Sequence, residues 1–278
     1  MRRILVTSAS GANGDGYGTL LCFSAGGELT GPFSNDPRIT DPRGLSLSPA
    51  GDLVYITSGD DRVLALDKNG NVTLDSGRQE GLDAGGGAFA PDGRYCVTLR
   101  RRGTILALPP RLDTAGELLL PDGVVPFPRG FGFGDDGQLY LSSGIGPSGE
   151  GDNTIATFDR EGRLRNPRLV SDPELSPLDL AIAPGGNLVV SSEWPFGSPS
   201  ATATIREYDA STGRLVRVLA PDPAVKFTRP RGLRFAPGGR LYCVGQDHII
   251  AFDVPAGRFL GVIAELRKLN GQAVLLLT

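Results

Sequence analysis

Hydrophobic and polar positions repeat along this chain as short apolar runs separated by tight turns. Five segments share an apolar run, a turn containing glycine and a second apolar run: RGLSLSPAGDLVYITS from Arg43, GGAFAPDGRYCVTL from Gly86, RGFGFGDDGQLYLSS from Arg129, LDLAIAPGGNLVVSS from Leu178 and RGLRFAPGGRLYCVG from Arg231. The turn glycines recur every 42 to 53 residues. A third run follows in each segment, and then a weaker fourth. Each repeat therefore predicts four short antiparallel strands.

A unit of four antiparallel strands that recurs in this way is typical of a β-propeller blade. Five complete units predict blades at residues 42–77, 84–121, 128–171, 177–220 and 230–263. The two ends of the chain share the remaining blade, in which residues 1–33 supply three strands and residues 270–278 supply the innermost one. We therefore predict one all-β domain over residues 1–278, a six-bladed propeller whose ring is closed by both termini. Such closure leaves no free sheet edge between the ends.

Composition narrows the partners and the compartment. The 40 glycines and 22 prolines fit a chain with many turns, and a net charge of −3 argues against a nucleic-acid partner. The three cysteines Cys22, Cys96 and Cys243 lie far apart in apolar runs, as expected of buried thiols in a reducing compartment. No apolar run is long enough for a signal peptide or a membrane span. We expect a cytoplasmic monomer without a membrane partner.

The repeats also carry a family resemblance. PRGLSLSPAGDLVYITSGDDRVLALDKNG and PRGLRFAPGGRLYCVGQDHIIAFD resemble NHL-type repeats, and the resemblance covers essentially the whole chain. At the level of the fold, the chain is similar to gluconolactonase-like, calcium-dependent phosphotriesterase and strictosidine-synthase-like propellers. The resemblance implies a ligand site at the loop-rich mouth of the central channel. It implies little about chemistry, because such scaffolds host lactonases, lyases, condensing enzymes and binding modules.

An alignment of the blades on their turn glycines places one residue per blade at the channel mouth. These residues are Asn270, Arg43, Gly85, Arg129, Leu178 and Arg231 for blades one to six. Arginine thus occupies every second blade, and three guanidinium groups at one mouth favour a carboxylate or phosphate ligand. Alternatively, each arginine pairs with an acidic or backbone acceptor of an adjoining blade, for which Asp41, Asp122 and Asp179 are available. Both interpretations stay open.

The metal-binding relatives hold a divalent cation with acidic and amide side chains at these mouth positions. In this chain only Asn270, and Asp179 next to the mouth position Leu178, could serve as ligands, and the three arginines would repel a cation. The sequence therefore predicts no bound metal and no other cofactor, although a rearranged metal site stays an alternative.

Long loops between the second and third strands are the second indication of a site. They occur in blades one, four and five, and the loop of blade five places Glu193 beside Trp194 and close to Phe196. Aromatic neighbours can desolvate a carboxylate and suit it to general acid–base catalysis. Glu193 is therefore the first catalytic candidate. The alternative is that the two rings only cap the edge of the blade.

Several weaker candidates complete the set. Tyr17, Asp15, Asp152 and Asn153 lie in long loops of the same face, and Asp179 is a weak catalytic candidate. His248 is the sole histidine, so any histidine chemistry must use it. Its place at the start of a third strand, away from the axis, favours a structural hydrogen-bonding role.

These observations favour a metal-independent enzyme of the hydrolase, lyase or cyclase type that binds a polar or anionic small molecule at the channel mouth. One alternative is a non-catalytic recognition module that binds a ligand, peptide or protein across the same face. A second alternative is a metal-dependent, lactonase-like hydrolase. A concave pocket of several hundred cubic ångströms would favour the enzyme, and a flat, solvated face the recognition module.

Overall fold

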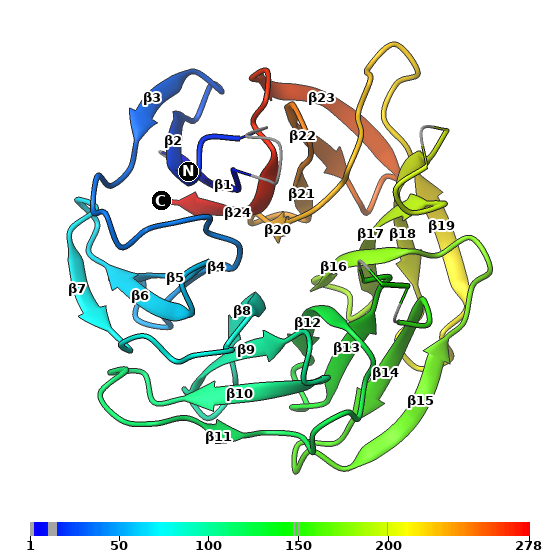
Figure 1. Cartoon of the computed structure of the whole chain (residues 1–278). Helices are drawn as coiled ribbons and strands as arrows, with labels where there is room; N and C mark the ends of the chain where they lie inside the picture. The colour runs from blue at the N-terminus through cyan, green and yellow to red at the C-terminus, as the bar shows by residue number, and fades with distance from the viewer. Residues whose placement is uncertain (1–2, 11–15, 147, 150, 199) are drawn as a thin grey trace.

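The computed structural model describes residues 3–10, 16–146, 148–149, 151–198 and 200–278. Within these ranges the chain forms six four-stranded antiparallel sheets around a central axis (Figure 1). The predicted all-β, six-bladed propeller is confirmed. The described ranges contain no helix, and so none that could cross a membrane.

Each sheet contributes its first strand to the centre and its fourth strand to the rim (Figure 1). The innermost strands of blades one to six are β24 (Gly271–Leu277), β4 (Leu45–Leu47), β8 (Ala84–Phe89), β12 (Pro128–Phe133), β16 (Pro177–Ile182) and β20 (Leu233–Phe235). The second strands are β1 (Arg3–Ser8), β5 (Val54–Ser58), β9 (Tyr95–Leu99), β13 (Leu139–Ser143), β17 (Leu188–Trp194) and β21 (Arg240–Val244). The third strands are β2 (Thr19–Ser24), β6 (Arg62–Leu66), β10 (Thr104–Leu108), β14 (Thr154–Phe158), β18 (Thr202–Tyr208) and β22 (His248–Asp253). The outer strands are β3 (Leu29–Pro32), β7 (Val72–Asp75), β11 (Glu117–Leu118), β15 (Leu164–Val170), β19 (Leu215–Leu219) and β23 (Arg258–Glu265).

The two ends of the chain meet in the first blade. Strand β24 pairs with β1 in antiparallel register, with Ile4 opposite Leu276, and β1 pairs on its other side with β2. The predicted closure by both termini is therefore confirmed. The pairing with β24 shifts register between Thr7 and Ser8, and the two innermost strands of blades three, four and five show a register shift as well.

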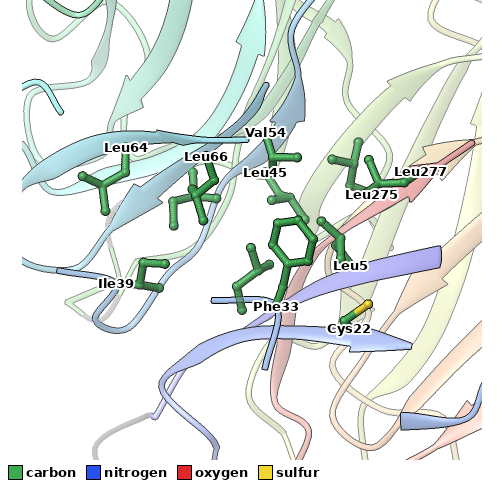
Figure 2. Close-up of a cluster of buried hydrophobic side chains, with 12 residues drawn as sticks. Leu5, Cys22, Phe33, Ile39, Leu45, Val54, Leu64, Leu66, Leu275 and Leu277 are labelled. Carbon is green, nitrogen blue, oxygen red and sulfur yellow. The ribbon is translucent and has the colours of Figure 1, made fainter. Parts of the chain in front are cut away.

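The apolar core lies between neighbouring blades rather than at the axis. Figure 2 shows one such layer, to which the first blade contributes Leu5 and Leu275 among others and the second blade contributes Leu45 and Leu64. Buried apolar side chains form a cluster of this kind in each of six regions. A strand buried on both faces needs no hydrophobic–polar alternation, which explains why the second and third strands read as continuous apolar runs. The three cysteines are buried and unpaired to one another, as predicted.

Glycine in the repeated Arg-Gly pair lets adjacent innermost strands approach closely. A Cβ atom on Gly44 would lie 2.9 Å from the backbone nitrogen of Gly87, and one on Gly232 would lie 2.4 Å from Cα of Ala273. A Cβ on Gly130 would lie 2.6 Å from Cα of Asp179. No other residue type fits these positions without displacing backbone. The glycines therefore keep the central channel narrow and fix the height of each preceding arginine.

A candidate ligand site in the central channel

The innermost strands enclose a channel of about 420 Å³ around the axis. The glycine contacts between neighbouring strands align the six strands by height. One residue per blade then stands at the mouth; we call this set the mouth ring, and it comprises Arg43, Gly85, Arg129, Leu178, Arg231 and Gln272. Gln272 lines the channel where the sequence alignment placed Asn270. The Asn270 side chain instead donates a hydrogen bond of 2.8 Å to the carbonyl of Ala9.

Hydroxyl groups of the second strands hold the mouth ring in place. Thr7 Oγ1 donates to the carbonyl of Arg43 at 2.9 Å, and Ser191 Oγ donates to the carbonyl of Arg231 at 2.7 Å. In both cases the hydroxyl belongs to the preceding blade. Each bond satisfies a carbonyl that the short first strands β4 and β20 leave outside their ladders. The backbone that carries these two arginines is therefore tied to two blades.

On one side of the mouth, arginines meet a carboxylate. Asp83, which precedes β8, accepts from Arg43 Nη1 at 3.2 Å and from Arg100 Nη2, and Arg101 Nε lies 3.5 Å away. Arg43 also lies 3.9 Å from Asp41. Burial, together with the neighbouring positive charge of Arg43, lowers the pKa of Arg100. For Arg43 the structure thus agrees with the interpretation that mouth arginines pair with an adjoining blade.

On the other side of the mouth, guanidinium groups alternate with aromatic rings. The Arg129 guanidinium lies 4.9 Å from the ring centre of Phe127 and 5.3 Å from that of Phe196. The Arg231 guanidinium lies 5.8 Å from the ring centre of the same Phe196, and that of Arg100 lies 5.6 Å from the ring centre of Phe127. Arg129 also donates to the carbonyl of Ile145. We call this series, from Arg100 through Phe127, Arg129 and Phe196 to Arg231, the cation–π row.

Arg231, the last member of the row, is the arginine with the least satisfied side chain. Its Nε and Nη1 atoms are buried and have no hydrogen-bond partner among the described residues. Burial lowers the pKa of the guanidinium to about 10, while the nearby Glu193 carboxylate favours its charged form. Buried N–H donors are seldom left without acceptors, so Arg231 differs in this respect from the paired Arg43.

Below the mouth ring, the channel contains one carboxylate and one further arginine. Asp179 Oδ2 accepts from the backbone nitrogen of Leu233 at 2.8 Å, and burial raises the pKa of this carboxyl to about 6. Arg234 donates from Nη2 to the carbonyl of Leu45 at 3.0 Å, but its buried Nε has no partner among the described residues. Burial lowers the pKa of Arg234, although the charge of Asp179 acts against this. A carboxyl that titrates near neutral pH can both accept and donate a proton.

Four residues further along each innermost strand, every blade presents an apolar side chain. We call these six residues the far ring: Leu47, Phe89, Phe133, Ile182, Phe235 and Leu276. All six are half-buried. The channel therefore changes from cationic at the mouth to apolar at its far end.

Glu193 and Trp194, the first candidates from the sequence, lie beside the channel rather than on its wall. Glu193 is buried, and its Oε1 accepts from the backbone nitrogen of Arg229 at 3.2 Å. Trp194 is 36% exposed, and the described structure records no ring contact for it. Phe196 enters the cation–π row, so the loop of blade five reaches the site through this ring. A catalytic role for Glu193 stays a prediction.

The weaker candidates make local contacts. Tyr17 is 48% exposed, and Asp152 Oδ2 pairs with Arg168 at 2.9 Å. Asn153 has a positive φ of 53°, whereas Asp15 lies outside the described residues. His248 begins β22, with Nε2 at 3.9 Å from Glu265. None of the described residues in this group lines the channel.

Sequence reasoning missed three residues of the site. Arg100 follows the second strand of blade three, Phe127 precedes the first strand of blade four, and Arg234 lies within β20. The repeat alignment considered one position per blade and so excluded all three. A buried arginine inside an otherwise apolar first strand, as in RGLRF, is the signal that could have identified Arg234.

The residues at the mouth do not fit a divalent cation. Hard cations need several oxygen ligands, whereas the mouth ring offers three guanidinium groups, one glycine, one leucine and a single amide oxygen. No group of three or more His, Cys, Asp or Glu residues with metal-site geometry occurs in the described parts of the chain. A metal-dependent mechanism therefore has no ligand set at this place.

Comparisons with known proteins support the fold. No protein-family model and no curated protein matches the chain, so the similarity to NHL repeats stays a prediction. Among solved structures, a protein of unknown function from Bacteroides caccae matches with a TM-score of 0.71 at 12% identity, covering 98% of this chain and 97% of that one.

Two groups of enzymes also share the architecture. A virginiamycin B lyase from Staphylococcus aureus matches with a TM-score of 0.57 at 17% identity, covering 81% of this chain and 71% of that one. A gluconolactonase from Xanthomonas campestris matches with a TM-score of 0.59 at 18% identity, covering 80% of this chain and 75% of that one. At such identities the likeness shows the fold alone. The expected relation to gluconolactonase-like propellers is thus confirmed at the level of the fold.

Proposed function

We propose that this protein is a metal-independent enzyme that binds a small anionic substrate at the channel mouth. The carrying observation is Arg231, whose buried Nε and Nη1 face no acceptor in the described structure. A carboxylate or phosphate group would accept a hydrogen bond from one of these donors and, with its second oxygen, from the neighbouring Nη2 of the same guanidinium group. The concave channel of about 420 Å³ has the size of a small-molecule site, which favours this function over a recognition module with a flat face.

In this proposal Asp179 is the general acid or base that exchanges a proton with the bound substrate. It lines the channel one residue below the mouth ring, and its pKa of about 6 lies near the working pH of an intracellular enzyme. The solved lyase and gluconolactonase structures with this fold support an enzyme in general terms. We assign the reaction to the hydrolase, lyase or cyclase type, since one carboxyl group acting as general acid or base can serve each of these reactions.

Anion binding is tested by isothermal titration of acetate and of phosphate at pH 7 and low salt. Arg231→Gln should weaken both about tenfold or more, because a hydrogen bond to a charged group contributes about 1.5–3 kcal/mol. Arg102→Gln is the matched control, since Arg102 pairs with Asp122 on the surface of blade three. Equal affinities for Arg231→Gln and the wild type would remove the basis of the proposal.

The hydrolase branch is tested with two chromogenic esters. 4-Nitrophenyl hydrogen succinate carries a carboxylate, whereas 4-nitrophenyl acetate does not. We expect the charged ester to be hydrolysed with the higher kcat/KM, and Asp179→Asn to lower kcat at least a hundredfold while acetate still binds. Unchanged turnover in Asp179→Asn would exclude Asp179 as the proton-transfer group.

A further inference from the structure

The channel has a polar end, and an apolar cavity lies next to its other end. This second cavity of about 410 Å³ is lined by Leu47, Leu276 and Pro237 among others. It shares Ala88, Phe89, Arg234 and Phe235 with the channel at the mouth, so the two cavities are adjacent. An elongated ligand that follows these shared wall residues would extend from one cavity into the other.

The polar side chains halfway along the channel leave part of its wall apolar. Asp179 and Arg234 belong to the neighbouring strands β16 and β20, and Arg234 reaches across to β4, where Nη2 donates to the carbonyl of Leu45. At the depth of Arg234, β8 and β12 present Ala88 and Gly132 to the channel. An apolar chain can therefore pass the two charged groups along the wall formed by β8 and β12.

We infer that the substrate class is an amphipathic monoanion, with its carboxylate at Arg231 and an apolar tail that extends to the far ring. This inference rests on the proposed anion site and adds the second half of the ligand. A ligand without a tail would leave six half-buried apolar side chains in contact with water at the far end. A neutral apolar ligand would leave the buried Nε and Nη1 of Arg231 without an acceptor.

Strand geometry sets the length of the tail. The far ring lies four residues below the mouth ring, and a strand rises about 3.3 Å per residue, so the rings are about 13 Å apart. An extended alkyl chain advances about 1.3 Å per C–C bond, so about ten bonds span the full distance. The roughly seven bonds of octanoate bring its terminal methyl group to about 4 Å from the far ring, which is the distance of an apolar contact.

The inference is tested with sodium acetate, butanoate, hexanoate and octanoate by isothermal titration at constant pH and ionic strength. Affinity should rise about three- to fourfold per methylene group up to octanoate, as expected for buried methylene groups. Arg231→Gln should weaken every member by a similar factor, and Arg231→Lys should restore part of the loss. Circular dichroism spectra verify that both variants fold.

A variant at the far ring isolates the tail. Ile182→Thr removes apolar surface from the channel wall while keeping a β-branched side chain, and it should weaken octanoate about threefold and leave acetate unchanged. Ile263→Thr on the outer strand β23 is the matched control and should change neither affinity.

Three results would overturn the inference, and they differ in what they leave standing. If acetate binds through Arg231 but affinity does not rise with chain length, the tail site is wrong and the anion site stands. If no carboxylate binds, the anion site fails as well. If neutral 1-octanol binds as tightly as octanoate, the tail binds without the proposed head group, and the assignment of an anionic ligand is wrong.

Discussion

Two aspartates on alternate blades illustrate how position decides the role of a charge in this channel. Asp83 precedes β8 and contacts three guanidinium groups, those of Arg43, Arg100 and Arg101. Asp179 lies within β16, next to Arg231's blade, but it accepts from the backbone nitrogen of Leu233 and has no ion pair among the described residues. The first aspartate neutralises arginines, whereas the second forms a hydrogen bond with the backbone.

The difference follows from the backbone rather than from residue type. Asp83 adopts a positive φ of 36° before its strand begins, which places its carboxylate above the channel wall among the arginine side chains. Asp179 is held inside the strand ladder, where the close approach of Gly130 confines it. A carboxylate in the loop can reach long flexible side chains, and one in the strand can reach only the neighbouring backbone.

The largest expected effect concerns the pH dependence of stability. Because burial raises the pKa of Asp179 from 3.8 to about 6, the folded state binds its proton more tightly than the unfolded state. The stability contributed by protonated Asp179 is complete below about pH 4 and is lost as pH rises through 6. Its loss costs up to about 3 kcal/mol.

Urea unfolding of the wild type and Asp179→Asn between pH 4 and pH 7.5 measures this effect. The free energy of unfolding of the variant should rise relative to that of the wild type as pH rises. The reason is that the amide oxygen can still accept from the backbone nitrogen of Leu233 without carrying a charge. A difference between the two proteins that stays constant over this range would contradict the assigned environment of Asp179.

The second prediction acts on the other aspartate. Asp83→Asn removes the carboxylate shared by three arginines, two of them largely buried, and should lower the free energy of unfolding at pH 7 by about 2 kcal/mol. The same change should raise the affinity for acetate several-fold, because Arg43 and Arg100 lose their counter-charge.

Asp122→Asn provides the control for the second prediction. Asp122 pairs with Arg102 where both side chains are about half exposed, and such a surface pair contributes only about 0.5 kcal/mol. Denaturant unfolding and titration on both variants make the comparison. Equal destabilisation by the two substitutions would show that the Asp83 cluster has no special role.

The fold was predictable because its determinants are local and repeated. Five blades each carry a turn glycine and four apolar runs, and the two ends of the chain supply the strands of the sixth, so the six-bladed ring follows from counting them. The arginines of the mouth ring were predictable for the same reason. Gln272 was not, because the two innermost strands of its blade are the two ends of the chain, without the glycine turn on which the other blades were aligned. Arg100 and Phe127 reach the site through long side chains from neighbouring loops, and no repeat pattern records such contacts.

The smallest expected effect concerns Phe196, whose aromatic ring contacts Arg231 where a carboxylate contacts Arg43 on the other side of the mouth. Phe196 lies between the guanidinium groups of Arg129 and Arg231, and each such contact contributes about 0.5–1 kcal/mol. Phe196→Leu keeps an apolar side chain but removes the ring face. It should lower the free energy of unfolding by less than about 1 kcal/mol and weaken acetate about threefold, because Arg231 loses the surface that orients it.

Trp194→Leu is the matched control for this substitution, since it removes a more exposed ring from the same segment of blade five. It should leave acetate affinity unchanged in the same titration. If both variants bind acetate as the wild type does, the ring does not orient Arg231, and the hydrogen bonds of its backbone alone fix the arginine. If only Phe196→Leu weakens binding, the Phe196 ring orients Arg231 as the Asp83 carboxylate orients Arg43. Unlike the carboxylate, the ring leaves the positive charge that an anionic ligand needs.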